Sequence, residues 1–373
     1  MLSGATIPHR ARSRPSPHSP ERRAPITRNV NLALQGGGAH GAFAWGVLDR
    51  LLEGDEIEIA AISGTSAGAL NGAALRAGLA TAPGRPGREA ARANLRHVWS
   101  EVARYSDNSM VRWMTSFLPV PTRMQRLAEM MSPMAWLEGV TRVFSPYDYG
   151  PFYHNPLGPI IRRMPHPRLD TDAGPRLFVT ATNVRTGRVR IFSGAEVTAD
   201  AVMASACLPT LFRAVEITDP ATGRREAFWD GGYSGNPAIF PLFGADLPRD
   251  VIVIAVNPME RDHLPRSPVE IQDRINEISF NSSLLRELRA IQFVKRLSSE
   301  GRLTGRNMKE PLLHMIFDDE LMTSLGSRSK VMPAPGLVAR MFDAGRSAAQ
   351  GFVDANLDHI GARDTVDLPP LYG

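Results

Sequence analysis

Cysteine, metal-binding patterns and long apolar runs are scarce in this sequence. Cys207 is the single cysteine among 373 residues, which excludes an internal disulfide framework and a zinc site built from several cysteines. We expect it to be a small buried residue in a reducing compartment. No histidine or acidic cluster has the spacing of a motif such as H-E-x-x-H, so no metal and no other cofactor is expected. The longest strongly apolar run, residues 251–256, is far too short to cross a bilayer.

Positive charge is concentrated at the start of the chain. Residues 1–28 hold six arginines and one glutamate, a difference that equals the net charge of +5 of the whole sequence. Because the segment is rich in proline, serine and arginine and has no apolar signal-peptide core, we expect a disordered basic tail. Binding of this tail to anionic lipid or nucleic acid is the alternative to a solvated tail. The rest of the chain is near neutral, and no nucleic acid is expected as a partner. The predicted location is the cytoplasm, with transient contact to a membrane surface as an option.

The stretch at residues 57–75 combines a strand, a sharp turn and a helix. Apolar and β-branched residues at 57–62 favour a short buried strand, and the alanine-rich segment from Ala67 favours a helix. Between them stands Gly64-Thr65-Ser66-Ala67-Gly68, a Gly-x-Ser-x-Gly pentapeptide. In a nucleophile elbow, small flanking residues allow such a turn to hold a serine at the carboxyl end of a strand. We therefore predict that Ser66 is a nucleophile, supported by Gly64 and Gly68.

A glycine-rich loop follows the first predicted strand, NVNLALQ, and precedes a helix. It contains Gly36, Gly37, Gly38 and, after Ala39 and His40, Gly41. Such loops direct several backbone N–H groups at one point, which suits either a phosphate or a developing oxyanion. The phosphate interpretation would make this a dinucleotide fingerprint, with Asp55 or Glu56 near the position of a ribose-binding acid. Because the next strand ends at Ser66, we interpret the loop as an oxyanion hole.

A third motif lies far along the chain. Residues 226–229 lead into Asp230-Gly231-Gly232. An acid before two glycines is a common turn by itself. A catalytic serine needs a base, however, and a carboxylate on a glycine-rich turn can approach a hydroxyl without steric obstruction. We therefore predict Asp230 as the general base, supported by Gly231 and Gly232.

The three motifs in this order resemble the patatin-like phospholipase family, in particular its bacterial members, over residues 29–258. The resemblance implies a three-layer α/β/α fold, a Ser66–Asp230 dyad that hydrolyses acyl esters of lipids, and oxyanion N–H groups from Gly36, Gly37 and Gly38. It also implies that neither histidine nor metal takes part. One departure is His40, where many relatives have lysine or arginine. A neutral imidazole would serve less fully as a cation there, and we expect His40 to pack or hydrogen-bond within the loop.

The expected fold class is α/β, with a mainly parallel central sheet and additional cap and C-terminal helices. We predict a patatin-like catalytic domain over 29–260 and a mainly helical C-terminal extension over 261–373, packed on the same domain. A helical cap or lid is expected at 81–150, where a loop precedes a helix at 89–105 and methionines and aromatics are frequent at 110–144. Further strands are expected at 175–184, near 189–191, at 251–258 and at 312–317, and helices at 199–206, 268–297 and 338–357. No catalytic group is expected after Pro258.

Two other functions remain open at this stage. In a Ser-Asp-His triad of the α/β-hydrolase type, His263, His314 or His359 would fill the third position by chain order. Alternatively, the chain is a non-catalytic nucleotide-binding module in which Ser66 is incidental. The sequence leaves the acyl ester, the regioselectivity and the oligomeric state undetermined.

Overall fold

A computed structural model of the chain describes most of the sequence from residue 27 onward. The described residues are 27–104, 145–148, 150, 153, 155–166, 169, 171–220, 222–261, 264–302, 309–325, 328–331 and 333–368. The predicted basic tail and the methionine-rich part of the predicted cap lie outside them, apart from residues 27 and 28.

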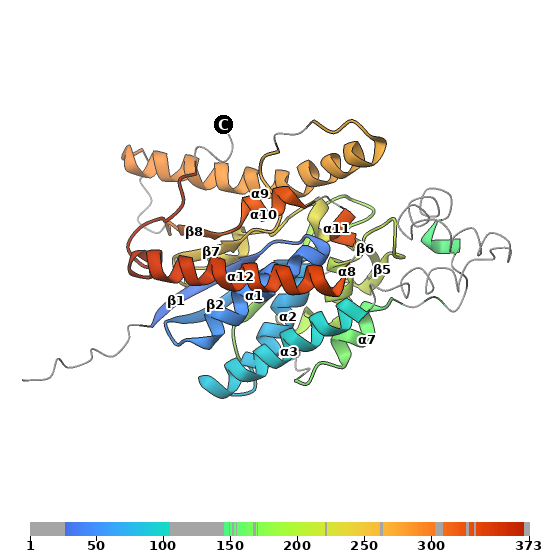
Figure 1. Cartoon of the computed structure of the whole chain (residues 1–373), viewed down its shortest axis with the longest axis horizontal. Coiled ribbons are helices and arrows are strands. Elements are labelled where there is room, and N and C mark those ends of the chain that lie inside the picture. Colours follow the sequence, from blue (N-terminus) through green and yellow to red (C-terminus); the bar gives the residue numbers. More distant parts are fainter. Residues whose placement is uncertain are drawn as a thin grey trace, which may run out of the picture.

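A single eight-stranded sheet forms the centre of the molecule (Figure 1). Its order is β5-β6-β3-β2-β1-β7-β8, and β4 pairs with β3. The neighbouring strands β3, β2, β1, β7 and β8 are parallel in that order. Strands β4 and β6 pair antiparallel with β3, and β5 pairs antiparallel with β6. The strands are β1 (Arg28–Leu34), β2 (Ile57–Thr65), β3 (Arg176–Asn183), β4 (Val189–Ser193), β5 (Val215–Thr218), β6 (Arg225–Asp230), β7 (Asp250–Ile254) and β8 (Leu312–Ile316).

Helices cover both faces of the sheet, because the central strands are apolar on both sides. In β1, Leu32 and Leu34 enter one core and Ala33 enters the other, as the two-residue period of a strand requires. The larger core lies under α1 (Gly41–Glu53), α2 (Ala67–Leu79), α3 (Arg85–Arg104), α7 (Leu157–Arg162), α8 (Ala199–Ser205), α10 (Asp319–Ser324) and α12 (Pro335–Asn356). The smaller core lies under α9 (Pro268–Ser299), which Figure 1 shows apart from α1, α2, α3 and α12. These layers confirm the predicted α/β/α fold with a mainly parallel sheet.

Several predicted elements have different bounds in the structure. The helix expected at 89–105 begins at Arg85, because Pro86 in its first turn gives up an N–H that has no partner at a helix start. The strand expected at 251–258 ends at Ile254, and the amides of Val256 and Asn257 turn instead to the side chain of Gln35. The short elements β5, β6, α7, α10 and α11 (Arg328–Val331) were not predicted. None of them is long enough to show a period in the sequence.

The C-terminal region contributes to the same sheet and the same helical layer. Strand β8 extends the parallel sheet beside β7, and α12 lies across α1 (Figure 1). The carboxylate of Asp49 on α1 accepts hydrogen bonds from Arg92 on α3 and from Arg346 on α12, which ties the three helices together. The division into a catalytic domain and an extension at residue 260 stays a prediction.

Within the described residues, no helix combines the length and the apolar character needed to span a bilayer.

Glycine allows α12 to approach α1 closely, and this contact can be tested. A Cβ atom on Gly345 would lie 2.0 Å from the carbonyl oxygen of Phe43, whereas one on Gly351 of the same helix would meet nothing within 4 Å. We predict that Gly345→Ala lowers the free energy of unfolding by about 1–3 kcal/mol through overpacking. Gly351→Ala should instead raise it by about 0.5–1 kcal/mol through helix propensity. Denaturant unfolding of both variants measures this, and equal effects would contradict the described helix contact.

Candidate active site

The three predicted motifs meet at one edge of the sheet. Strands β1 and β2 are parallel neighbours, so the glycine loop after β1 and Ser66 after β2 emerge side by side. Strand β3 lies between β2 and β6, with Thr65 paired to Thr180 and Asp230 paired to the next residue, Ala181. This register brings the ends of β2 and β6 to nearly the same level of the sheet. The side chains of Ser66 and Asp230 therefore face each other although 164 residues separate them.

Ser66 occupies a strained turn. Its backbone has φ 55° and ψ −122°, and it is the one non-glycine residue with positive φ in the described part of the chain. Such a conformation is costly for a residue with a side chain and is typical of a nucleophile elbow. The turn is held because the Ser66 N–H donates to Ser205 Oγ at 2.9 Å, and Ser205 donates in turn to the carbonyl of Thr180 at 2.6 Å. Ser205, on α8, was not predicted as a site residue.

The carboxylate of Asp230 is fully buried and has two hydrogen-bond donors. Ser66 Oγ donates to Oδ2 at 2.7 Å, and the Gly232 N–H donates to Oδ1 at 2.8 Å. Burial raises the pKa of Asp230 to about 7, and the two hydrogen bonds oppose that rise only in part. A carboxylate with a pKa near neutrality is a stronger base than an exposed one, which suits proton abstraction from a hydroxyl.

The glycine loop lies against Ser66, and its N–H groups differ in their availability. The Gly36 N–H donates to Asn236 Oδ1 at 2.7 Å and is therefore occupied. The N–H groups of Gly37 and Gly38 have no hydrogen-bond partner among the described residues. Gly38 has φ 59°, a left-handed conformation that glycine adopts readily. Two of the three predicted donors are thus free to bind an oxyanion.

Close packing explains why the remaining motif positions are glycine. A Cβ atom would lie 2.6 Å from Ser66 Cβ at Gly36 and 2.1 Å from the Leu34 carbonyl oxygen at Gly68. The distance from an added Cβ atom to its nearest neighbour would be 2.5 Å at Gly41, 2.5 Å at Gly64, 2.2 Å at Gly231 and 3.0 Å at Gly232, and each neighbour belongs to the site or its supports. Larger side chains at most of these positions would push the three turns apart.

An apolar pocket opens beside Ser66. Its described lining includes Trp99 and Val102 of α3, residues of α7, and the loop after α8. The lining residues are Gly38, Ala39, Ser66, Ala67, Leu70, Trp99, Val102, Pro156, Leu157, Ile160, Ala206, Leu208, Leu211, Phe212, Lys330 and Pro333. The methionine- and aromatic-rich segment at 110–144, part of the expected cap, lies outside the described residues. The described pocket wall includes Pro156, Leu157 and Ile160, which follow the expected cap in the sequence.

The triad candidates that lie within the described residues contact other groups. His314 is buried on β8, where its ring contacts Asp250 and Thr365, and His359 contacts Arg363. His263 lies outside the described residues. The direct 2.7 Å contact between Ser66 and Asp230 leaves no space between them for an imidazole, which argues against the triad.

Burial lowers the pKa of His40 to about 3, so its ring is neutral, and Nε2 contacts Ser329 Oγ at 2.6 Å. The hydrogen-bond partner of His40 thus comes from α11, whereas we expected His40 to pack or hydrogen-bond within the loop.

Cys207 is buried, as predicted, and burial raises the pKa of its thiol to about 12. A thiol with that pKa is not a nucleophile at neutral pH. In the described part of the chain, no group of three or more histidine, cysteine or acidic side chains could hold a metal ion.

The site defines an α/β protein with a serine elbow, a glycine loop and a buried acid in direct contact with the serine. A family model described as patatin-like phospholipase matches residues 32–243, more than half of the chain and all three motifs. The chain belongs to the patatin-like phospholipase family. The general class of activity is therefore that of a lipid acyl hydrolase.

Two solved structures are similar to the chain at low identity. VipD from Legionella pneumophila is 17% identical with a TM-score of 0.38, over 88% of this chain and 67% of that one. The type III effector protein ExoU is 13% identical with a TM-score of 0.32, over 89% of this chain and 54% of that one. The chain thus spans about half the length of ExoU. A search of curated proteins found no match.

The raised pKa of Asp230 has a consequence for stability. The folded state binds the carboxyl proton of Asp230 more tightly than the unfolded state does. Protonation of Asp230 therefore stabilises the folded protein, and this stabilisation is fully present below about pH 4 and is lost as pH rises through about 7. Asp230→Asn removes the buried charge. We predict that the free energy of unfolding of Asp230→Asn, relative to that of wild type, is higher at pH 8 than at pH 5 by about 2 kcal/mol.

Denaturant unfolding at several pH values measures this gain, with the surface variant Asp358→Asn as the control for loss of one negative charge. A difference between Asp230→Asn and wild type that does not change with pH would show that burial does not raise the pKa of Asp230.

Proposed function

We propose that the protein is a serine esterase in which Ser66 is the nucleophile and Asp230 the general base, without a histidine. The observation that carries this proposal is the 2.7 Å hydrogen bond from Ser66 Oγ to Oδ2 of a fully buried carboxylate. The strained elbow supports it, because the turn presents Oγ at the pocket while α2 begins at the next residue. The dipole of that helix favours negative charge beside the serine.

In the first half of the reaction, Asp230 accepts the Ser66 proton as Oγ attacks the ester carbonyl carbon. The N–H groups of Gly37 and Gly38 stabilise the oxyanion of the tetrahedral intermediate, while the Gly36 N–H stays with Asn236. The intermediate collapses when the carbon–oxygen bond to the alcohol breaks and the alcohol takes the proton from Asp230. Ser66 is then acylated.

In the second half, water attacks the acyl carbonyl and gives its proton to Asp230. The glycine loop stabilises the second oxyanion, the bond to Oγ breaks, and the proton returns to Ser66. The fatty acid leaves. Asp230 thus acts alternately as base and acid, a task that a pKa near neutrality suits at neutral pH.

The substrate class follows from the pocket. Its described wall is mostly aliphatic and aromatic, so an acyl chain would bury apolar surface there while its ester carbonyl lies at Ser66. We place the activity among carboxylic ester hydrolases of the phospholipase or lysophospholipase kind, acting in lipid catabolism. Brief contact with a membrane surface in the cytoplasm would supply such lipids. Residues 29–260 would form the catalytic domain, with 81–150 as its cap and 261–373 as its extension.

Two substitutions test the dyad. Ser66→Ala removes the nucleophile and Asp230→Asn removes the base, so each should lower turnover of a short-chain aryl ester by a factor of about 10³ or more. A fluorophosphonate probe should label wild type and leave Ser66→Ala unlabelled. His359→Gln serves as the control that should keep wild-type turnover, since the dyad needs no histidine.

Circular dichroism and thermal unfolding establish that the variants are folded. Folded Ser66→Ala or Asp230→Asn with wild-type turnover would remove that residue from its role. If wild type remains unlabelled and a nucleotide raises its melting temperature, the nucleotide-binding alternative is correct.

A further inference from the structure

A short helix from the C-terminal region contacts the glycine loop directly. α11 carries Ser329, which contacts the buried ring of His40, and Lys330, whose carbonyl oxygen would lie 2.2 Å from a Cβ atom on Gly38. The loop is thus enclosed by a segment about 290 residues away in the sequence. No catalytic group was expected in this region of the sequence.

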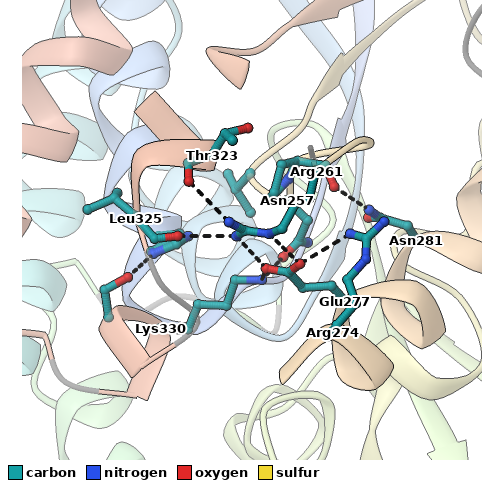
Figure 2. A network of polar contacts seen from close by, with 12 residues as sticks. Asn257, Arg261, Arg274, Glu277, Asn281, Thr323, Leu325 and Lys330 are labelled. Atoms are coloured by element: carbon teal, nitrogen blue, oxygen red, sulfur yellow. Dashed lines mark hydrogen bonds and ion pairs between the residues drawn. The ribbon is translucent and has the colours of Figure 1, made fainter. Parts of the chain in front are cut away.

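The ammonium of Lys330 lies in a network of polar contacts with Asn257 and Glu277 (Figure 2). Lys330 Nζ donates to Asn257 Oδ1 at 2.8 Å and to Glu277 Oε1 at 3.3 Å. Asn257 is 2% exposed, and its Nδ2 donates to the carbonyl oxygen of Gly36 at 2.8 Å. Asn236 Nδ2 donates to the same oxygen at 3.2 Å. A chain of hydrogen bonds therefore connects Lys330, through Asn257, to the peptide between Gly36 and Gly37.

That peptide is planar and trans, so its carbonyl and its N–H point in opposite directions. Two amides that fix the Gly36 carbonyl on one side thereby fix the direction of the Gly37 N–H on the other. Gly37 N–H is one of the two unoccupied donors of the loop. The orientation of the Asn257 side chain thus decides how firmly an oxyanion donor is aimed.

Lys330 decides the orientation of Asn257. A side-chain amide can rotate by half a turn, which exchanges its oxygen and its nitrogen. An ammonium offers only donors, so it holds Oδ1 toward itself and leaves Nδ2 toward Gly36. Its charge also polarises the amide and strengthens the hydrogen bond that Nδ2 donates.

Glu277 holds the lysine in place. This carboxylate is 2% exposed and accepts hydrogen bonds from both Arg261 and Arg274 (Figure 2). Burial lowers the pKa of Lys330, and the charge of Glu277 opposes that change. Because the two arginines stay on Glu277 when Lys330 is replaced, loss of the lysine does not leave a buried carboxylate unpaired.

We propose that Lys330 is a positioning residue for the oxyanion hole, acting through Asn257 on the Gly36–Gly37 peptide. The proposal rests on the proposed esterase function. It assigns a catalytic contribution to the region after residue 260: α11 and α9 complete the support of a loop that begins at residue 36.

The test compares Lys330→Met, Asn257→Ala and the double variant on a short-chain aryl ester. Each single substitution should lower kcat about tenfold to a hundredfold with little change in KM, because it disturbs a contact made in the transition state. The double variant should be no slower than Asn257→Ala alone, since Lys330 acts through Asn257. Lys330→Arg should recover most of the lost kcat.

Arg274→Met is the matched control. It also removes one cation from Glu277, but Arg274 has no described contact with Asn257, so kcat should stay at the wild-type value. Thermal unfolding of every variant separates a catalytic defect from a folding defect.

Three results would overturn the proposal: an unchanged kcat in folded Lys330→Met, multiplicative losses in the double variant, or a loss confined to KM, which would make Lys330 a substrate-binding residue. Fluorophosphonate labelling distinguishes these from failure of the esterase function. If Ser66 is labelled in wild type and at the same rate in Lys330→Met, the inference alone is wrong. If Ser66 is not labelled in wild type, the proposed function is wrong.

Discussion

The hydrogen bond between Ser66 and Asp230 sets the constraint on which the site depends. It joins two turns that lie 164 residues apart, and it forms only because β3 holds β2 and β6 in a fixed register. Thr182 on β3 strengthens that register by donating to the Asp230 carbonyl at 2.8 Å, and Thr65 on β2 donates to the carbonyl of Gly235 at 2.7 Å. Hydroxyl groups of the sheet thus tie the acid turn to the serine turn, which leaves Asp230 fully buried and Ser66 at the pocket.

The site combines unfavourable features that the surrounding structure compensates. Burial raises the pKa of the Asp230 carboxyl group, and Ser66 with φ 55° is strained. The glycine loop keeps unpaired N–H groups beside an apolar pocket. Each feature destabilises the folded protein, and each is useful once an ester carbonyl enters the pocket. The parallel strands, buried on both faces, and the tight crossing of α1 and α12 supply the stability that these features need.

Much of the fold and the core of the site could be predicted from the sequence, because the signals are local. The strand before Ser66, the glycines around it and the helix after it are contiguous, and the same holds for the loop at Gly36. The supports could not be predicted in this way. Ser205, Asn236, Asn257 and Lys330 reach the site from four separate segments, and a lone polar residue gives no pattern that distinguishes a buried support from a surface position. The neutral state of His40 follows from burial by α11, a helix too short to show a period.

The most direct measurement is a crystal structure of the protein after reaction with a fluorophosphonate, whose phosphorus mimics the tetrahedral carbon of the intermediate. The account predicts a covalent bond from Ser66 Oγ to phosphorus, the phosphonyl oxygen within hydrogen-bond distance of the Gly37 and Gly38 N–H groups, and the alkyl group in the pocket beside Trp99. An adduct on another residue, or a phosphonyl oxygen directed away from the glycine loop, would contradict it.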